Sequence, residues 1–136
     1  MIDHNRLEEI TRIVVDCGYH LHRDLGPGLL ETAYEVLLTG LLQKRGLHVR
    51  RQVAVPIKYD GVVVDNAFRI DLLVEDMLPL ELKSTERVSP IHAKQLLTYL
   101  RLMNLPLGLL MNFGQGTMKE GLKRVVNDYD GDFRQR

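Results

Sequence analysis

The fold is decided by residues 68–84, which read FRIDLLVEDMLPLELKS. They form two apolar runs separated by a short acidic turn, a pattern typical of two strands that pair antiparallel. Side chains alternate between the two faces of a strand, so Glu81 and Lys83 project together while the leucines beside them point into a core. Asp71 lies in the first run, and the turn at residues 76–79 is short enough to return the chain beside it. We therefore expect two carboxylates and a lysine to meet on neighbouring strands.

The composition predicts one soluble cytoplasmic domain. The 136 residues are 45% hydrophobic, enough for a single core spanning residues 1–136 and too few for two. The 18 basic and 18 acidic residues cancel, which argues against a tight nonspecific duplex binder but less against an enzyme that meets phosphate through a metal ion. Cys17 is the single cysteine and excludes an internal disulfide. No apolar run approaches the roughly 20 residues that span a membrane.

Two helices are predicted before the first strand. The first begins after Asp3, a capping residue, and ends at the glycines and proline of residues 26–28. Its apolar positions recur at three- and four-residue steps and are Leu7, Ile10, Val14, Cys17 and Leu21. This stripe suits packing inside the domain or against a second copy of the chain, and the sequence leaves both open. The second helix spans residues 29–45, with inward positions Leu30, Tyr34, Leu37, Leu38 and Leu41.

The strands that follow begin with a hairpin. Residues 47–59 are rich in β-branched residues and alternate, Asp60-Gly61 is a two-residue turn signal, and the extended pattern resumes at residue 62. Pro56 has no N–H to give to a ladder, so it predicts an edge strand or an irregularity. A third strand covers residues 78–84.

A helix and a further strand complete the predicted sheet. Ser89 and Pro90 are typical of an N-cap and a first helical residue, and the helix runs to about Asn104. Residues 107–112 read as a buried strand, which a right-handed crossover should place parallel to a neighbour. The sheet is therefore expected to be mixed, and residues 118–126 indicate a short closing helix or strand.

Asp71, Glu81 and Lys83 have the chemistry of a metal-dependent hydrolytic site. Magnesium prefers oxygen ligands and often takes one or two carboxylates, with water and substrate phosphate completing its shell. Lys83 could position the attacking water and stabilise charge that develops on the phosphoryl group. An acid-x-Lys pattern also occurs in strands that carry only a surface ion pair, and spacing alone does not separate these two interpretations.

Three more polar residues fall where they could support such a site. Glu31 lies at the start of the second helix, where it is either a third acidic ligand or simply a favourable partner of the helix dipole. Gln95 and Tyr99 are four residues apart and share one face of the third helix, where they could contact a phosphate or Lys83. Tyr99 could equally be a packed residue at the edge of the core.

Several segments together resemble the GxxExxY protein family, a branch of the PD-(D/E)XK nuclease-like superfamily. They are LGPGLLETAY at residues 25–34, Asp71, ELK at residues 81–83, QLLTY at residues 95–99 and GLLMNFG at residues 108–114. The resemblance covers nearly the whole chain, and Ile70 stands where the name of the superfamily has proline.

This resemblance implies an α/β fold of the restriction-endonuclease-like kind, with an α-β-β-β-α-β core, a mixed central sheet and an additional N-terminal helix. The site residues it implies are Glu31, Asp71 and Glu81 as ligands of Mg²⁺ or Mn²⁺, Lys83 as the catalytic lysine, and Gln95 and Tyr99 as supporting residues. The expected function is a metal-dependent nuclease acting on DNA or RNA. The alternative is a noncatalytic module that binds nucleic acid or another protein and retains the nuclease fold.

Overall fold

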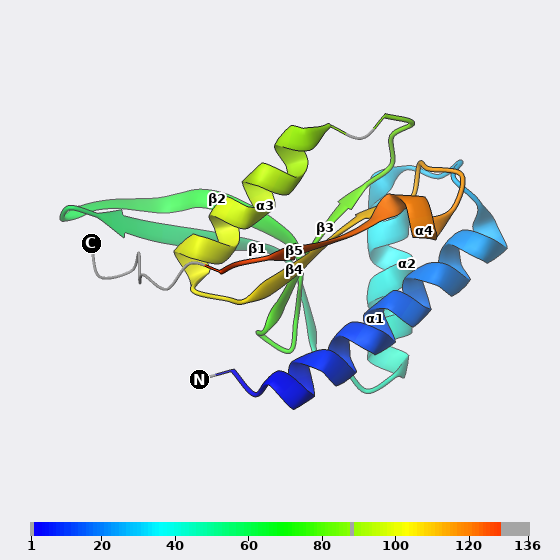
Figure 1. Cartoon of the computed structure of the whole chain (residues 1–136), viewed down its shortest axis with the longest axis horizontal. Helices are drawn as coiled ribbons and strands as arrows, with labels where there is room; N and C mark the ends of the chain where they lie inside the picture. Colours follow the sequence, from blue (N-terminus) through cyan, green and yellow to red (C-terminus); the bar gives the residue numbers. More distant parts are fainter. Residues whose placement is uncertain (1, 88, 129–136) are drawn as a thin grey trace.

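A computed structural model of the chain describes residues 2–87 and 89–128. In this part of the chain five strands form one sheet in the order β1-β2-β3-β4-β5, with helices on both faces (Figure 1). The elements in chain order are α1 (His4–Leu25), α2 (Glu31–Lys44), β1 (Val49–Tyr59), β2 (Val62–Val74), β3 (Leu78–Lys83), α3 (Pro90–Met103), β4 (Leu107–Asn112), α4 (Met118–Gly121) and β5 (Leu122–Val126). The predicted fold is confirmed, since α2 to β4 form the α-β-β-β-α-β core and α1 is the additional helix.

The sheet is mixed, as predicted. β1, β2 and β3 follow one another antiparallel. β3 and β4 are parallel because α3 carries the chain back between them, and β5 returns antiparallel to β4. The closing segment contains both structures that the sequence indicated, because α4 leads directly into β5.

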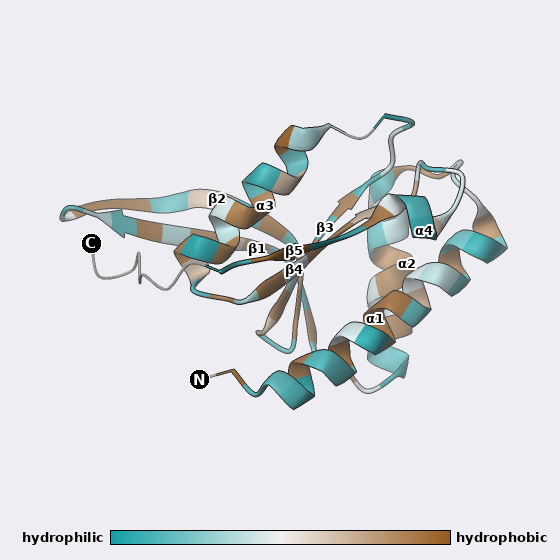
Figure 2. Cartoon of the chain, in the orientation of Figure 1, coloured by the Kyte–Doolittle hydropathy of each residue, from teal (hydrophilic) through white to brown (hydrophobic). Residues whose placement is uncertain are grey.

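Two apolar clusters join the layers, one on each face of the sheet. Leu80 and Leu82 of β3 are buried in the cluster that includes α1 and α2. Leu96 and Leu100 of α3 belong to a second cluster with Leu110 of β4. Hydrophobic residues accordingly follow the central strands in Figure 2. Each large apolar side chain contributes roughly 1.5–3 kcal/mol when fully buried, so the helices hold the central strands firmly from both sides.

The apolar stripe of α1 packs inside the domain. All five of its predicted positions are buried and belong to the cluster shared with α2 and the sheet. Of the two arrangements that the sequence left open, the structure therefore has the internal one. Asp3 caps the helix by accepting hydrogen bonds from the N–H groups of Asn5 and Arg6. Among the helices of residues 2–87 and 89–128, none is both long and apolar enough to cross a membrane.

The hairpin of β1 and β2 forms at the predicted turn. Asp60 and Gly61 both have positive φ angles, of 50° and 78°, which suit the right-handed twist of the two strands. The pairing register shifts between Val55 and Ile57, where Pro56 cannot donate to the ladder. The far end of this hairpin extends beyond the rest of the sheet (Figure 1).

The inward face predicted for α2 is partly wrong. Leu30 is 81% exposed and Leu37 is 40% exposed, whereas Leu42 is buried together with Tyr34 and Leu38. Leu30 precedes the helix in an extended conformation, so its side chain does not continue the helical stripe. The buried positions recur every four residues and form a narrower stripe than the one expected from the leucine content.

Candidate active site

The acidic pair lies where the ladder between β2 and β3 ends. Leu72 pairs with Leu80 in the antiparallel register, so the next positions along these strands are Asp71 and Glu81. Beyond this point the carboxylates of these two residues, in place of backbone carbonyls, accept hydrogen bonds from backbone N–H groups of the neighbouring strand. The N–H of Leu82 donates to Asp71 Oδ2 at 2.8 Å, and the N–H of Asp71 donates to Glu81 Oε1 at 3.4 Å. The two carboxylates are therefore neighbours at the point where the strands separate.

Glu81 is in an environment that disfavours a second negative charge. Burial, followed by the charge of Asp71, raises the pKa of Glu81 from 4.5 to about 8, against the opposing influence of Lys83. The positive charge near this pair of carboxyl groups is too small for both of them to ionise readily. A divalent cation or a phosphate-bound cation would supply it, because the charge of a bound ion reverses the local preference for a protonated acid.

Lys83 lies on the same face of β3 as Glu81. The two residues are separated by one position, and the intervening Leu82 is buried on the other face. The carbonyl of Lys83 accepts a hydrogen bond from the N–H of Phe113 at 2.8 Å, which holds the end of β3 against the chain that leaves β4. The amine thus emerges from a fixed backbone beside the acidic pair.

Glu31 is the first residue of α2, and its charge interacts with those of Asp71 and Lys83. Partial burial from water raises the pKa of Glu31. The charges of Asp71 and Glu35 raise this pKa further, and those of Lys83 and His92 lower it. In residues 2–87 and 89–128, no three histidine, cysteine, aspartate or glutamate side chains are grouped so as to hold a metal ion. The structure brings Asp71 and Glu81 into contact, and the role of Glu31 as a third ligand stays a prediction.

A tyrosine and a serine hold the loop that leads to Glu31. The hydroxyl of Tyr34 donates to the carbonyl of Gly26 and accepts from the N–H of Leu29, while the hydroxyl of Ser84 donates to the carbonyl of Leu29 at 2.8 Å. The ring of Tyr34 is fully buried and stacks on Phe113 with 4.4 Å between centroids. The Gly-x-x-Glu-x-x-Tyr spacing therefore has a structural component, because its tyrosine fixes the entry to α2.

Tyr99 of α3 lies near the acidic pair. Burial, followed by the charges of Glu81 and Asp71, raises the pKa of its phenol. Its ring stacks almost parallel on Phe68, with 4.1 Å between centroids. Tyr99 is thus packed against Phe68 and close to the acids, and its contact with a phosphate or Lys83 stays a prediction. Gln95 is exposed one turn earlier on α3, and its contribution to the site stays a prediction.

Sequence reasoning missed two residues, Glu35 and Gln52, that form a hydrogen-bond network with Asp71. Glu35 is buried and accepts hydrogen bonds from Arg51 and Gln52, and Gln52 also reaches Asp71. One signal was available, because Glu35 follows Glu31 by four residues and so shares its face of α2. The position of Gln52 depends on an unusual backbone angle that no sequence pattern indicates.

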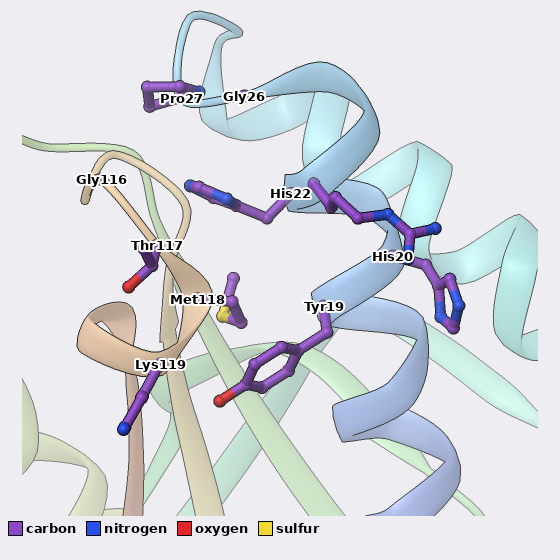
Figure 3. A pocket seen from close by; sticks show the side chains of 10 residues that line it. Tyr19, His20, His22, Gly26, Pro27, Gly116, Thr117, Met118 and Lys119 are labelled. Atoms are coloured by element: carbon purple, nitrogen blue, oxygen red, sulfur yellow. The ribbon is translucent and has the colours of Figure 1, made fainter.

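A separate hollow of about 590 Å³ lies between the C-terminal end of α1 and residues 116–119 (Figure 3). Met118 sits between Tyr19 and His22 in this view, and Thr117 and Lys119 lie beside them. None of the predicted site residues lines the hollow. The candidate active site is therefore the acidic pair and its surroundings, which lie elsewhere on the sheet.

Comparison with known families places the chain in a superfamily. A family model described as the PD-(D/E)XK nuclease superfamily matches residues 8–125. The chain belongs to this superfamily. The membership confirms the broader resemblance and is compatible with the narrower GxxExxY family. Nucleases of the PD-(D/E)XK superfamily typically use divalent metal ions and act on nucleic acids. No curated protein and no solved structure matches the chain.

Proposed function

We propose that the protein is a metal-dependent nuclease that hydrolyses phosphodiester bonds in DNA or RNA. The observation that carries this proposal is the contact between Asp71 and Glu81, with Lys83 on the same face of β3, in a chain of the PD-(D/E)XK superfamily. Asp71 and Glu81 are the proposed ligands of Mg²⁺ or Mn²⁺. Glu31 completes the set directly or through a water molecule.

The residues present fit such an ion. Carboxylate oxygens are the ligands that Mg²⁺ prefers, and one or two of them suffice when water and substrate phosphate fill the other positions. The high pKa of Glu81 supports the fit, because burial and Asp71 leave this pair short of positive charge. The bound ion would polarise a phosphoryl oxygen and lower the pKa of a coordinated water.

The remaining chemistry is assigned to side chains of the chain itself. Lys83 orients the attacking water and stabilises the charge that grows on the phosphate oxygens. We assign Lys83 positioning and charge stabilisation rather than proton removal, because a compact ammonium group suits the stabilisation of negative charge on phosphate oxygens. Tyr99 and Gln95 are proposed to contact the substrate phosphate or Lys83 from α3.

Cleavage assays test this proposal directly. Labelled single- and double-stranded DNA and RNA are incubated with Mg²⁺ or Mn²⁺ and, in parallel, with EDTA. We expect metal-dependent cleavage that falls about 100-fold or more in Lys83→Ala, the magnitude typical of a lost charge-stabilising group. Arg50→Ala is the matched control, because the side chain of Arg50 is exposed and pairs with Asp76 in the turn after β2. Equal rates in Lys83→Ala and the natural chain would remove the role assigned to this lysine.

A noncatalytic binding module is the second candidate. It is favoured by the zero formal charge of the chain and by the lack of three grouped metal ligands in residues 2–87 and 89–128. This alternative predicts that DNA, RNA or a protein partner binds equally well with EDTA and with Mg²⁺, and that no substrate is cleaved. The same assays, read by gel shift before cleavage is scored, distinguish the two functions.

A further inference from the structure

Gln52 has an unusual backbone conformation within β1. Its φ angle is +51°, which residues other than glycine adopt rarely and at an energetic cost. The neighbouring pairs are Arg51 with Leu72 and Val53 with Ile70, so Gln52 lies opposite Asp71 in the register. A strained residue in the middle of a strand, facing a predicted metal ligand, indicates that its side chain has a defined task.

The side-chain amide of Gln52 joins two acidic residues. Its Nε2 donates to Glu35 Oε1 at 2.6 Å and to Asp71 Oδ1 at 3.3 Å. Asp71 Oδ2 accepts from the N–H of Leu82 at 2.8 Å. Both oxygens of Asp71 therefore have a donor, one from β1 and one from β3. Two donors on opposite sides restrict rotation of this carboxylate about its χ angles.

Glu35 is the anchor for this contact. It is only 6% exposed, and its Oε2 accepts from Arg51 Nε at 3.1 Å and Nη2 at 2.8 Å. A charged hydrogen bond with this paired geometry is stronger than a neutral one and fixes orientation. Glu35 also lies one turn after Glu31 on α2, so the two carboxylates share one face of this helix.

We infer that Gln52 is a positioning residue for the metal ligands, acting with the buried pair of Glu35 and Arg51. Gln52 holds the carboxylate plane of Asp71, and Glu35 ties the helix that carries Glu31 to strand β1. This inference rests on the proposed metal-dependent function for its effect on ion affinity. Its effect on the conformation of Asp71 is independent of that function.

A positioning role and a merely stabilising role predict different results. A hydrogen bond to a carboxylate contributes about 1.5–3 kcal/mol to stability. Loss of a residue that orients a metal ligand commonly lowers ion affinity by about 10–100-fold. Gln52→Gly removes the whole side chain, including the amide, and glycine accepts the positive φ without strain. Lost hydrogen bonding and relieved strain therefore oppose each other in stability, whereas only the lost amide acts on Asp71.

The experiment measures Mn²⁺ affinity by isothermal titration calorimetry and the χ1 angle of Asp71 by NMR scalar couplings in the metal-free full chain. Gln52→Gly should weaken Mn²⁺ binding about tenfold or more, whereas in stability the lost hydrogen bonds and the relieved strain, each about 1–3 kcal/mol, should largely cancel. Glu35→Gln should act in the same direction. The loss of Mn²⁺ affinity in the double variant should be smaller than the product of the two single fold-changes, because both substitutions break the same hydrogen-bond network. Arg50→Ala on the same strand is the control and should bind Mn²⁺ like the natural chain.

Two readings overturn the inference. One is Mn²⁺ affinity in Gln52→Gly equal to that of the natural chain. The other is an Asp71 χ1 angle that stays in a single rotamer after the amide is removed. If the natural chain itself binds no Mn²⁺, the proposed function fails. The χ1 measurement then decides alone, with rotamer averaging in Gln52→Gly supporting the positioning role and a single rotamer rejecting it.

Discussion

Replacing Glu81 with glutamine should stabilise the metal-free protein at neutral and alkaline pH. Glutamine keeps the shape of the side chain and its acceptor for the N–H of Asp71, but it removes the charge that the site disfavours. Burial and then the charge of Asp71 raise the pKa of Glu81 from 4.5 to about 8. At about 1.4 kcal/mol per pKa unit, the cost of ionising Glu81 in the folded state is on the order of 3–5 kcal/mol, an upper value because the group keeps some contact with water.

The pH window follows from the direction of this change. A carboxyl with a raised pKa contributes stability that is fully present below the pKa of the unfolded chain and is lost as the pH rises through the folded value. The free energy of unfolding of the natural chain should therefore fall between pH 4.5 and about 8. Glu81→Gln should lack this fall, so the two proteins should agree below the window and differ most above it.

Urea denaturation followed by circular dichroism, in EDTA and over a pH series spanning the window, measures this difference. Asp76→Asn is the control, because Asp76 is an exposed acid in the turn between the same two strands. Its difference from the natural chain should not grow through the window. Added Mg²⁺ should stabilise the natural chain more than Glu81→Gln. Parallel stability curves for Glu81→Gln and the natural chain, in EDTA and across the whole window, would refute the electrostatic reasoning.

Three further changes test the structure around the site. Tyr34→Phe should lower stability by about 1–3 kcal/mol in urea denaturation, because the carbonyl of Gly26 and the N–H of Leu29 lose their partner, and an unchanged midpoint would contradict this contact. Gly121→Ala should lower the free energy of unfolding by about 3 kcal/mol or more in the same assay, because its Cβ would lie 2.0 Å from the carbonyl oxygen of Asn112. An unchanged stability would show that the backbone at Gly121 can shift freely. Asp3→Ala should lower the thermal midpoint through loss of about 1 kcal/mol of capping, whereas Asp3→Asn should retain it.

Local chemistry explains why most of the fold could be predicted from the sequence. Capping residues and the Asp60-Gly61 turn each depend on a few adjacent residues, and the parallel pairing of β3 with β4 follows from the order strand, helix, strand. Each was found as expected. The prediction that Leu30 and Leu37 face inward was wrong, because leucine content indicates only that some face of α2 is buried. Which leucines face inward depends on where the helix begins, and boundaries are the least certain feature of such a prediction.

The candidate site could be predicted only in part. Asp71 and Glu81 were expected together because strand alternation and a short turn leave few other arrangements. Gln52 and Glu35 were missed because their contact depends on a tertiary approach of α2 to β1 and on a positive φ angle. Neither leaves a periodic pattern in the sequence. The supporting residues of an active site therefore required coordinates, whereas its charged centre did not.

The register shift at Pro56 also bears on association between molecules through the edge of the sheet. β1 is the outermost strand of the sheet in the described chain, and an outermost strand offers unpaired backbone groups to any other extended segment. An exposed proline halfway along it coincides with a shift in the pairing register with β2, so the strand does not present one regular row of donors and acceptors to a second molecule. We therefore expect the residue that disturbs the hairpin to oppose aggregation through this strand.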